Sequence, residues 1–470
     1  MLEDLLIKIV AFLITLMLVV IVHELGHFLF CKWFGIYVKT FSIGIGPKLL
    51  RQRWGETEYV ISAIPFGGYV KMAGEGMMEE IQDTGTWEER KYPLGTEEGN
   101  AEAAGMDDHI PPERHLHTRP AYQRLLVFIA GPLFNLALSF LLYSGLVLSN
   151  GLQTIPATTI GVVREASPAA EAGLLPGDVV VAVNGEAVAS WNNIIAGLLP
   201  EELEDGAQAS PAVLTVERAG RQLELELQPG FDAEAGYYTL GMEAWNTTVG
   251  LVKKGGPAED LGLQTGDRIL EVNGQVVMSF NSIATVINEH PDQEIEIVWD
   301  RGGARMSGFV TPELKEVAPG VMKGRIFMDQ FFAYEKVGLG EAMAIGYRQT
   351  AATIEQTLSV LGDFVKRKLG LDAVGGPLRI GQAAGEMLSW SFSHLLYFIA
   401  FFSINLFLLN LMPIPVLDGG HVLFLLLEVA RGGKPVPERL QAIATQVGLI
   451  ILLLFMTFIL VLDVWKVTGH

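Results

Sequence analysis

Four long apolar stretches restrict the possible folds of this chain more than any other feature of its sequence. They cover residues 5–30, 125–148, 395–412 and 443–462. A helix rises about 1.5 Å per residue, so about 20 residues cross the ~30 Å hydrocarbon core of a bilayer. Each stretch is long enough to do so, although Pro413 and Pro415 end the third before a further apolar run at 422–427. The sequence therefore predicts a multi-pass α-helical membrane protein with four transmembrane helices.

The composition agrees with membrane spans and argues against one class of partner. Half of the 470 residues are hydrophobic, and the formal net charge of −20 argues against nucleic-acid binding, which favours a basic face. Residues 75–113 carry 12 Asp and Glu side chains against only Arg90 and Lys91. We predict that the acidic segment 75–117 is a solvated, partly disordered loop. The acidic first residues do not resemble a cleavable signal peptide, and the single cysteine, Cys31, excludes an intrachain disulfide.

An internal repeat lies between the second and third apolar stretches. Residues 161–194 and 250–283 follow one pattern at an offset of 89, with coinciding Pro168 and Pro257, Gly177-Asp178 and Gly266-Asp267, and Asn184-Gly185 and Asn273-Gly274. Each copy predicts a strand, a short helix, a Gly-Asp turn, an apolar strand and an Asn-Gly hairpin turn.

The repeats resemble the bacterial, circularly permuted PDZ domain, so we expect two inserted α+β PDZ domains at 155–245 and 246–315. PDZ grooves recognise chain ends by strand addition, which would put Gly161, Val162, Gly250 and Leu251 in the two grooves. A spacer or a steric filter over the membrane fits the repeat equally well.

Two further segments have recognisable patterns. Residues 56–72 alternate apolar and polar side chains around a Pro-Phe-Gly-Gly break, which predicts a membrane-associated β-hairpin after the first span. Residues 316–393 form the expected connector back to the membrane. Within it, 337–372 has helical spacing with charges on one face, as in an interfacial or a soluble amphipathic helix.

The chemistry begins with His23-Glu24-Leu25-Gly26-His27, an H-E-x-x-H motif inside the first apolar stretch. Positions i and i+4 share one helix face, so both imidazoles can reach one Zn²⁺ while Glu24 lies beside the water that the ion activates. Ionisable side chains inside a span are costly to bury and usually mark function. The alternative is a polar cluster that lines a helix interface or a proton path.

A catalytic zinc site usually has three protein ligands, and Asp418 is the best candidate for the third. It follows Pro413 and Pro415 and precedes paired glycines, where irregular backbone at membrane depth needs a protein-lined or wet cavity. As alternatives, Asp418 could cap the helix that follows it, or the third ligand could be Cys31 or His421.

These motifs together resemble the site-2 protease family of intramembrane zinc metalloproteases. The resemblance rests on HELGH in the first span, on Gly131–Asn135 (GPLFN) in the second, and on Asn410, Pro413 and Leu417-Asp418-Gly419 near the third. The segment PFGGYVKM and the tandem PDZ repeats narrow it to the bacterial branch that regulates envelope stress by cutting an anti-sigma factor. The acidic segment 75–117 is longer than this family leads us to expect.

The resemblance implies roles for individual residues. His23, His27 and Asp418 would bind zinc, and Glu24 would be the catalytic acid and base. Substrate would contact Asn410 and Pro413, and it would pair with the hairpin edge at Gly67, Gly68 and Tyr69. An interhelical hydrogen bond is the alternative for Asn410.

The resemblance also implies location and partners. Residues 1–150 and 394–470 would form a protease core in the bacterial inner membrane, in contact with its lipids, with the PDZ domains outside the cytoplasm. Arg431, Lys434 and Arg439 in the last short loop agree with a cytoplasmic side there. Substrates would be single-span membrane proteins, including an anti-sigma factor after a first periplasmic cut. The alternative function is a non-proteolytic PDZ scaffold with a structural ion, although such a site has no need of Glu24.

Overall fold

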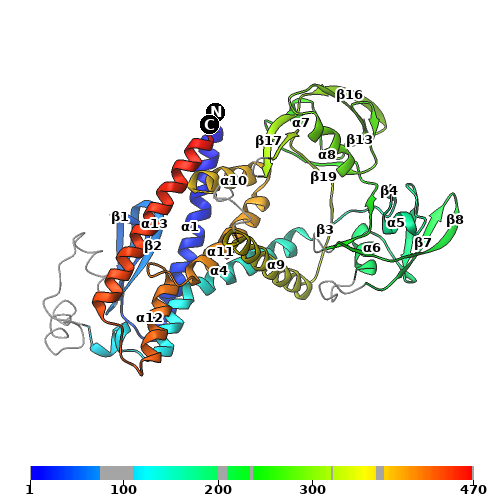
Figure 1. Ribbon diagram of the computed structural model, residues 1–470. Helices are drawn as coiled ribbons and strands as arrows, with labels where there is room; N and C mark the ends of the chain where they lie inside the picture. The colour runs from blue at the N-terminus through cyan, green and yellow to red at the C-terminus, as the bar shows by residue number, and fades with distance from the viewer. Residues whose placement is uncertain are drawn as a thin grey trace. The chain divides into compact units, whose positions relative to one another are not determined.

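The computed structural model describes residues 2–74, 110–199, 209–232, 237–318, 321–366 and 375–467. Most of the predicted acidic loop, 75–109, lies outside these residues. The chain divides into two compact units (Figure 1): Met1–Ser149 with Gly338–His470, and Asn150–Val337. We call them the core unit and, after the fold that its repeat is expected to adopt, the PDZ unit.

The core unit is built on long helices. Four of those in the described residues are long and apolar enough to cross a membrane: α1 (Leu2–Trp33), α4 (Ala121–Asn150), α11 (Phe392–Leu411) and α13 (Glu438–Val467). Each contains one of the four predicted stretches, except that Met412 of the third stretch is the C-cap of α11. The other helices among the described residues of this unit are η1 (Pro112–Arg114), η2 (Leu116–Thr118), α9 (Leu339–Val365), α10 (Pro377–Trp390) and α12 (Asp418–Ala430).

Small and hydroxyl side chains join these helices. A Cβ added at Gly26 of α1 would lie 2.5 Å from the Ala130 carbonyl oxygen of α4, so the two backbones approach as closely as glycine allows. Ser403 of α11 donates a hydrogen bond of 2.9 Å to the backbone oxygen of Asn135 in α4. Ser139 returns one of 2.8 Å to the Ala400 carbonyl of α11. Close approach and interhelical hydrogen bonds are the usual means of packing helices where lipid removes the hydrophobic driving force.

A sheet of two long strands, β1 (Val38–Trp54) and β2 (Thr57–Met72), follows α1. Thr40 pairs with both Lys71 and Glu58, and Ile43 pairs with both Gly68 and Ile61. Residues 40–43 therefore lie between two arms of β2, and 48–54 form an outer arm that pairs with 57–62. The prediction of a hairpin within 56–72 is wrong in its pairing, because residues 38–45 also alternate and take the middle position between its arms.

The PDZ unit contains the two predicted copies. The shared pattern of strand, short helix, strand and hairpin is β4, α5, β5 and β6 in the first copy and β12, α7, β13 and β14 in the second. Their bounds are β4 (Ile160–Val163), α5 (Pro168–Glu171), β5 (Val179–Val183), β6 (Glu186–Ala187), β12 (Val249–Val252), α7 (Pro257–Asp260), β13 (Arg268–Val272) and β14 (Gln275–Val276). Asn184 and Gly185, like Asn273 and Gly274, have positive φ at these hairpins, as a two-residue Asn-Gly turn requires.

Each copy continues with a helix and further strands. In the first these are α6 (Trp191–Leu198), β7 (Ala212–Arg218), β8 (Arg221–Leu227), β9 (Gly230–Asp232), β10 (Tyr237–Thr239) and β11 (Met242–Ala244). In the second they are α8 (Phe280–Glu289), β15 (Ile295–Arg301), β16 (Ala304–Val310), β17 (Glu313–Ala318), β18 (Val321–Arg325) and β19 (Met328–Gln330). The ends of the unit pair as β3 (Leu152–Thr154) with β20 (Ala333–Glu335).

The predicted boundary between 315 and 316 is displaced. β19 pairs with β12, and Ile326 belongs to the hydrophobic core of the second copy. Residues up to about 330 therefore complete the second domain, and helical structure in the connector begins only with α9. The first copy has the same arrangement, since its last strand, β11, pairs with β4.

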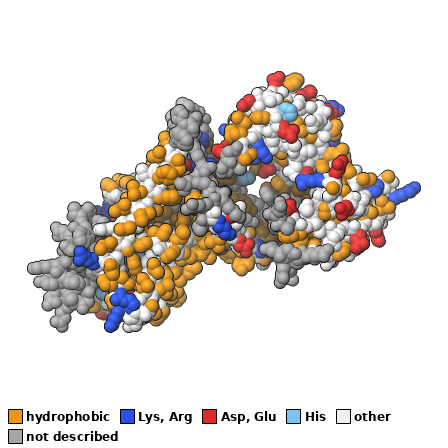
Figure 2. Space-filling model, viewed as in Figure 1, with side chains coloured by type: hydrophobic (Ala, Val, Ile, Leu, Met, Phe, Trp, Pro, Cys, Tyr) orange, Lys and Arg blue, Asp and Glu red, His pale blue; other side chains and the backbone are white. Residues whose placement is uncertain are grey.

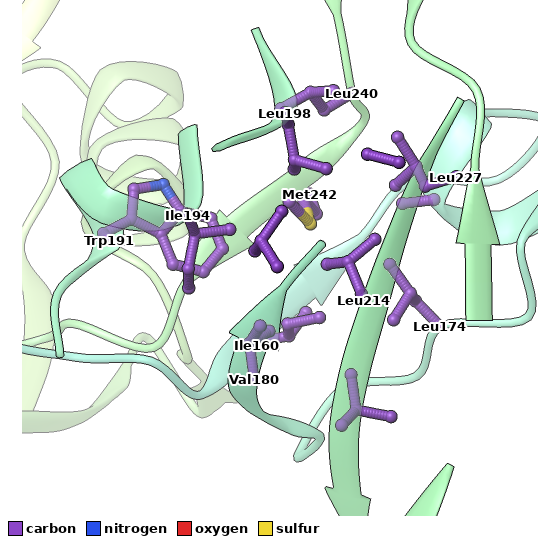
Figure 3. Close-up of a cluster of buried hydrophobic side chains, with 14 of the residues drawn as sticks. Ile160, Leu174, Val180, Trp191, Ile194, Leu198, Leu214, Leu227, Leu240 and Met242 are labelled. Carbon is purple, nitrogen blue, oxygen red and sulfur yellow. The ribbon is translucent and has the colours of Figure 1, made fainter. Parts of the chain in front are cut away.

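Each copy has its own hydrophobic core and one buried ion pair. Figure 3 shows the first core, where side chains of β5, β7 and β8 meet those of α6. Asp178 accepts 2.7 Å hydrogen bonds from Arg218, and Asp267 accepts equivalent bonds from Arg301. Burial of Asp178 opposes its ionisation, but the hydrogen bonds from Arg218 and from the Leu175 backbone hold its pKa below the ordinary value.

Candidate metal centre

Helix α1 places His23 and His27 one turn apart, with their Nε2 atoms 3.3 Å from each other. Asp418, the first residue of α12, brings a carboxylate to the same point from the other half of the chain. Its Oδ2 lies 3.1 Å from His23 Nε2, and its Oδ1 lies 3.4 Å from His27 Nε2. Leu417 is the N-cap of α12, and no side chain caps this helix, so the capping alternative for Asp418 is wrong.

The spacing of the three side chains fits a tetrahedral zinc site. Zn–N bonds of about 2.0–2.1 Å at tetrahedral angles separate the ligand atoms by about 3.3–3.4 Å. The two Nε2 atoms are 3.3 Å apart, and the Asp418 carboxylate lies 3.1 Å from one through Oδ2 and 3.4 Å from the other through Oδ1. Two imidazoles and one carboxylate also form a ligand set that zinc commonly takes when a fourth position stays open.

The hydrogen bond of His27 explains why its Nε2 is available. Its Nδ1 donates to the Val127 carbonyl oxygen of α4 at 2.8 Å, so the proton of the neutral ring is on Nδ1. The bare Nε2 then faces the Asp418 carboxylate, acceptor against acceptor. Such an arrangement favours a cation between the two groups.

His23 has a comparable partner in Asn135 of α4. The side-chain nitrogen of Asn135 lies 3.2 Å from His23 Nδ1, while its oxygen is buried with no hydrogen-bond partner among the described residues. The two ends of an amide differ only in which atom is placed where. Turned over, the Asn135 oxygen accepts a proton from His23 Nδ1, which satisfies that oxygen and leaves Nε2 of His23 bare as well. The sequence motif contained Asn135, but nothing in the pattern assigned it this partner.

Gly131 of α4 leaves room for the ligand atoms. A Cβ added there would lie 2.3 Å from His27 Nε2 and 2.8 Å from His23 Nε2. The Gly131 backbone therefore forms the wall behind the site, and any side chain would enter the space between the two imidazoles.

Glu24 lies beside the ligands and against the sheet. Its carboxylate accepts a hydrogen bond from the Val70 backbone, and a Cβ added at Gly68 would lie 3.0 Å from Glu24 Cγ. The glycine allows the edge arm of β2, residues 68–72, to lie directly on α1 at this residue. The motif thus has its two histidines turned toward α4 and α12 and its glutamate toward the strand.

The two rival ligands lie elsewhere. Cys31 is buried with its Sγ 3.0 Å from Met72 Sδ, and the His421 ring stacks on Phe128 with a centroid distance of 5.1 Å. Neither belongs to the group of ligand atoms found among the described residues, which is His23, His27 and Asp418.

The predicted substrate contacts lie on β2, on α11 and in the loop before α12. Gly67 and Tyr69 lie on the same arm of β2 as Gly68, and Gly67 needs glycine because its φ is +109°. Asn410 lies in the last turn of α11 and is 9% exposed, and its side chain makes no hydrogen bond within the described part of the chain. The interhelical bond that was its alternative is therefore not observed there. Pro413 is exposed in the loop before α12.

The predicted PDZ groove residues lie on equivalent strands. Gly161 and Val162 are on β4, and Gly250 and Leu251 are on β12. Both glycines allow close backbone approach: a Cβ at Gly161 would lie 2.5 Å from the Met278 carbonyl oxygen, and one at Gly250 would lie 2.3 Å from that of Gln330. The side chain of Leu251 is 40% exposed.

Known proteins resemble this chain over almost its full length. The sequence profile of Peptidase family M50 matches residues 11–455. The regulator of sigma-E protease RseP of Salmonella typhimurium is 30% identical over 463 residues, which cover 95% of this chain and 96% of that protein. Its counterpart from Escherichia coli K12 is 29% identical, with coverage of 95% and 96%. A protein of Neisseria meningitidis, provisionally named a zinc metalloprotease, is 30% identical over 98% of this chain and 99% of its own length.

Among solved structures, a PDZ domain of the SdrC-like protein from Listeria monocytogenes matches 18% of this chain and 87% of that domain, at 22% identity and a TM-score of 0.16. The match of the family profile spans both halves of the core unit and the PDZ unit between them. This chain therefore belongs to Peptidase family M50, the site-2 protease family of zinc metalloproteases.

Proposed function

We propose that this metalloprotease cleaves transmembrane segments of single-span membrane proteins inside the bacterial inner membrane, an anti-sigma factor being one such substrate. The observation that carries the proposal is the convergence of His23, His27 and Asp418 beside Glu24 within an apolar helix. Relatives named regulator of sigma-E protease support this class of substrate.

The depth of the site supports cleavage within the bilayer. The candidate span is Leu6–Trp33, and His27 precedes the cation Lys32 by five residues. At about 1.5 Å per residue the ligands lie roughly 7–8 Å inside the end of the span. A substrate bond that reaches this depth lies within its own transmembrane segment.

The chemistry follows from the groups around the site. A zinc ion bound by the three ligands would polarise the scissile carbonyl and acidify water at its open position. Glu24 then accepts the proton of the attacking water and delivers it to the leaving amine, which requires a carboxylate rather than an amide at this position. His27 is held by Val127 and His23 by Asn135, so neither ring has to reorient during the reaction.

The sheet offers a way to hold an unfolded substrate. A helical peptide bond is shielded by its own hydrogen bonds, so the substrate must unwind before attack. Residues 67–70 of β2 lie on α1 beside Glu24 and pair with β1 on one side. We propose that their other edge pairs with the unwound substrate by strand addition and that Asn410 and Pro413 contact it from the α11–α12 side.

We further propose that the PDZ unit lies outside the cytoplasm and limits which substrates reach the core. If two folded domains cover the entrance to the core unit, they limit the size of the substrate whether or not either groove binds a peptide. Recruitment through the grooves at Gly161, Val162, Gly250 and Leu251 is the competing role, and deletion of the unit separates the two.

Co-expression with a library of single-span membrane proteins tests the proposed activity. The wild-type protein should yield truncated products, and Glu24→Gln should abolish them, because loss of a general acid and base costs about 10²–10⁴-fold in rate. Zinc content by elemental analysis should be unchanged in Glu24→Gln, since no ligand is removed. Products that persist in this variant, or loss of its zinc, would contradict the role of Glu24.

A further inference from the structure

The outer arm of β1 has a composition that differs from the rest of the chain. Residues 48–54 read Lys-Leu-Leu-Arg-Gln-Arg-Trp, with three cations and no acidic residue in a protein of net charge −20. Lys48 pairs with Glu58 at 2.8 Å. Arg51 and Arg53 are exposed and have no ion pair within the described residues.

An ion-pair cluster fixes the depth of this arm relative to the first span. Glu56, in the turn after the arm, accepts a 2.6 Å bond from Lys32 in the last turn of α1. Arg114 binds the same carboxylate through both terminal nitrogens, at 2.8 and 2.9 Å, and lowers the pKa of Glu56. The turn of the sheet therefore lies at the level of Lys32, where the apolar span ends.

Exposed apolar side chains near the turn agree with this level, and Lys48, which lies farthest from the turn on this arm, has its charge paired with Glu58. Trp54, next to the anchored turn, is 81% exposed, and Trp33 at the end of α1 is 75% exposed. Tryptophan is enriched where the hydrocarbon core meets the headgroups. Leu49 and Leu50, farther from the turn along the same arm, are each 65% exposed and would face hydrocarbon.

From this arrangement we infer that residues 48–54 form a binding surface for anionic phospholipid headgroups. Arg51 and Arg53 supply the positive charge, Trp54 lies in the interface, and Leu49 and Leu50 enter the acyl region. As the outer arm, this strand also leaves backbone N–H groups on its free edge, and a phosphate oxygen can accept from them. Clustered basic residues beside a span attract anionic lipids of the adjoining leaflet. This inference concerns lipid binding and stands apart from the proposed cleavage.

The relative association of spin-labelled phosphatidylglycerol and phosphatidylcholine with the full-length protein in vesicles tests the inference. The wild-type protein should bind phosphatidylglycerol preferentially, and Arg51→Gln/Arg53→Gln should reduce that preference several-fold without changing association of phosphatidylcholine. Raising the salt concentration should shrink the difference, because exposed charges are screened.

Two control variants keep the test decisive. Arg51→Lys/Arg53→Lys retains the charge and should retain the preference, whereas Arg221→Gln/Arg268→Gln removes two exposed cations from strands of the PDZ unit and should leave it intact. Equal zinc content in all four proteins verifies that the core unit is folded. No preference in the wild-type protein, or an unchanged preference in Arg51→Gln/Arg53→Gln, overturns the inference.

Discussion

The core unit and the PDZ unit distribute their side chains in opposite ways. In the PDZ unit large apolar side chains such as Leu214 and Ile297 are completely buried. In α13 of the core unit Leu454 is 66% exposed, and Figure 2 shows hydrophobic side chains spread over the surface of these helices, whereas Asp463 on the same helix is 1% exposed. One unit hides apolar groups from water, and the other turns them toward lipid and buries polar groups instead.

The comparison separates two uses of a buried polar group. Asp178 and Asp267 each meet an arginine of their own domain, so the carboxylate is satisfied and its role is structural. In the core unit His23, His27 and Asp418 offer bare acceptor atoms to one another at a common point. Buried polar groups that have hydrogen-bond partners stabilise a fold, whereas a group of acceptors that point at one another indicates a site for a ligand.

The largest expected effect comes from the convergent group. Asp418→Ala should lower zinc content and peptidase activity together, because it removes the candidate ligand that α12 brings to His23 and His27. Cys31→Ser should leave both nearly intact, since Cys31 lies against Met72. Elemental analysis and cleavage assays on the same preparations measure the two. Zinc loss in Cys31→Ser with zinc retained in Asp418→Ala would show that Asp418 is not the third ligand.

Asn135→Leu sharpens the comparison, because it removes a buried polar group that touches a ligand without being one. We expect zinc affinity, measured by competition with a chelator, to fall about 10–100-fold, as is typical when the partner of a ligating histidine is lost. Thr15→Val is the matched control, a buried hydroxyl of α1 with no hydrogen-bond partner among the described residues. Equal zinc affinity in Asn135→Leu and the wild-type protein would remove Asn135 from the site.

Asp178→Asn tests the structural use of a buried charge. It should destabilise the first copy of the repeat by about 2 kcal/mol, at the low end for a buried pair because Arg218 is partly exposed. Hydrogen exchange of the β5 and β7 amides in the full-length protein measures the change, and Glu224→Gln, an exposed carboxylate of β8, is the control. Zinc content should not change in either variant.

The pH dependence of this stability has a definite sign. The folded-state pKa of Asp178 is lowered, so its contribution is present above the ordinary pKa of about 3.9 and is lost as the pH falls through the folded value. The wild-type domain should therefore lose more stability on acidification than Asp178→Asn. An equal loss in both proteins would show that the pair does not stabilise the fold.

The smallest effect on hydrolysis itself is expected from removal of the PDZ unit. Residues 155–332 can be replaced by a short flexible linker, because Thr154 of β3 pairs with Ala333 of β20. A gate predicts that a trimmed substrate is cleaved as before and that a substrate with a bulky extracytoplasmic domain becomes accepted. Recruitment predicts weaker cleavage of the trimmed form, mainly through apparent affinity. Continued rejection of the bulky form alongside normal cleavage of the trimmed form would refute the gate.

The spans, the repeat and the two histidines could be predicted because each depends on local spacing, whereas Asp418 was the best of three candidate ligands until the family resemblance favoured it. The predicted pairing of the strands in 56–72 was wrong. Alternation in 56–72 fixes which face each side chain takes but not which strand lies next to it, and residues 40–43 took that position. The ion pairs of the repeat were not predicted, because Arg218 lies 40 residues from Asp178 while Arg301 lies only 34 from Asp267. The two arginines therefore do not align at the offset of 89 that relates the two copies. The partners of the histidine rings, Val127 and Asn135, exist only once α1 and α4 are packed.

Gly131 has a consequence for how this centre is lost or recognised in other sequences. A methyl group added there would lie 2.3 Å from His27 Nε2 and 2.8 Å from His23 Nε2, too close for both rings to keep their positions. The methyl group of an alanine at 131 would thus occupy space beside the two Nε2 atoms that a metal ion needs. Such a chain would keep His23, His27, Asp418 and Glu24 in its sequence and still fail to bind the metal. A complete ligand set is informative about metal binding only when the residue behind it is read as well.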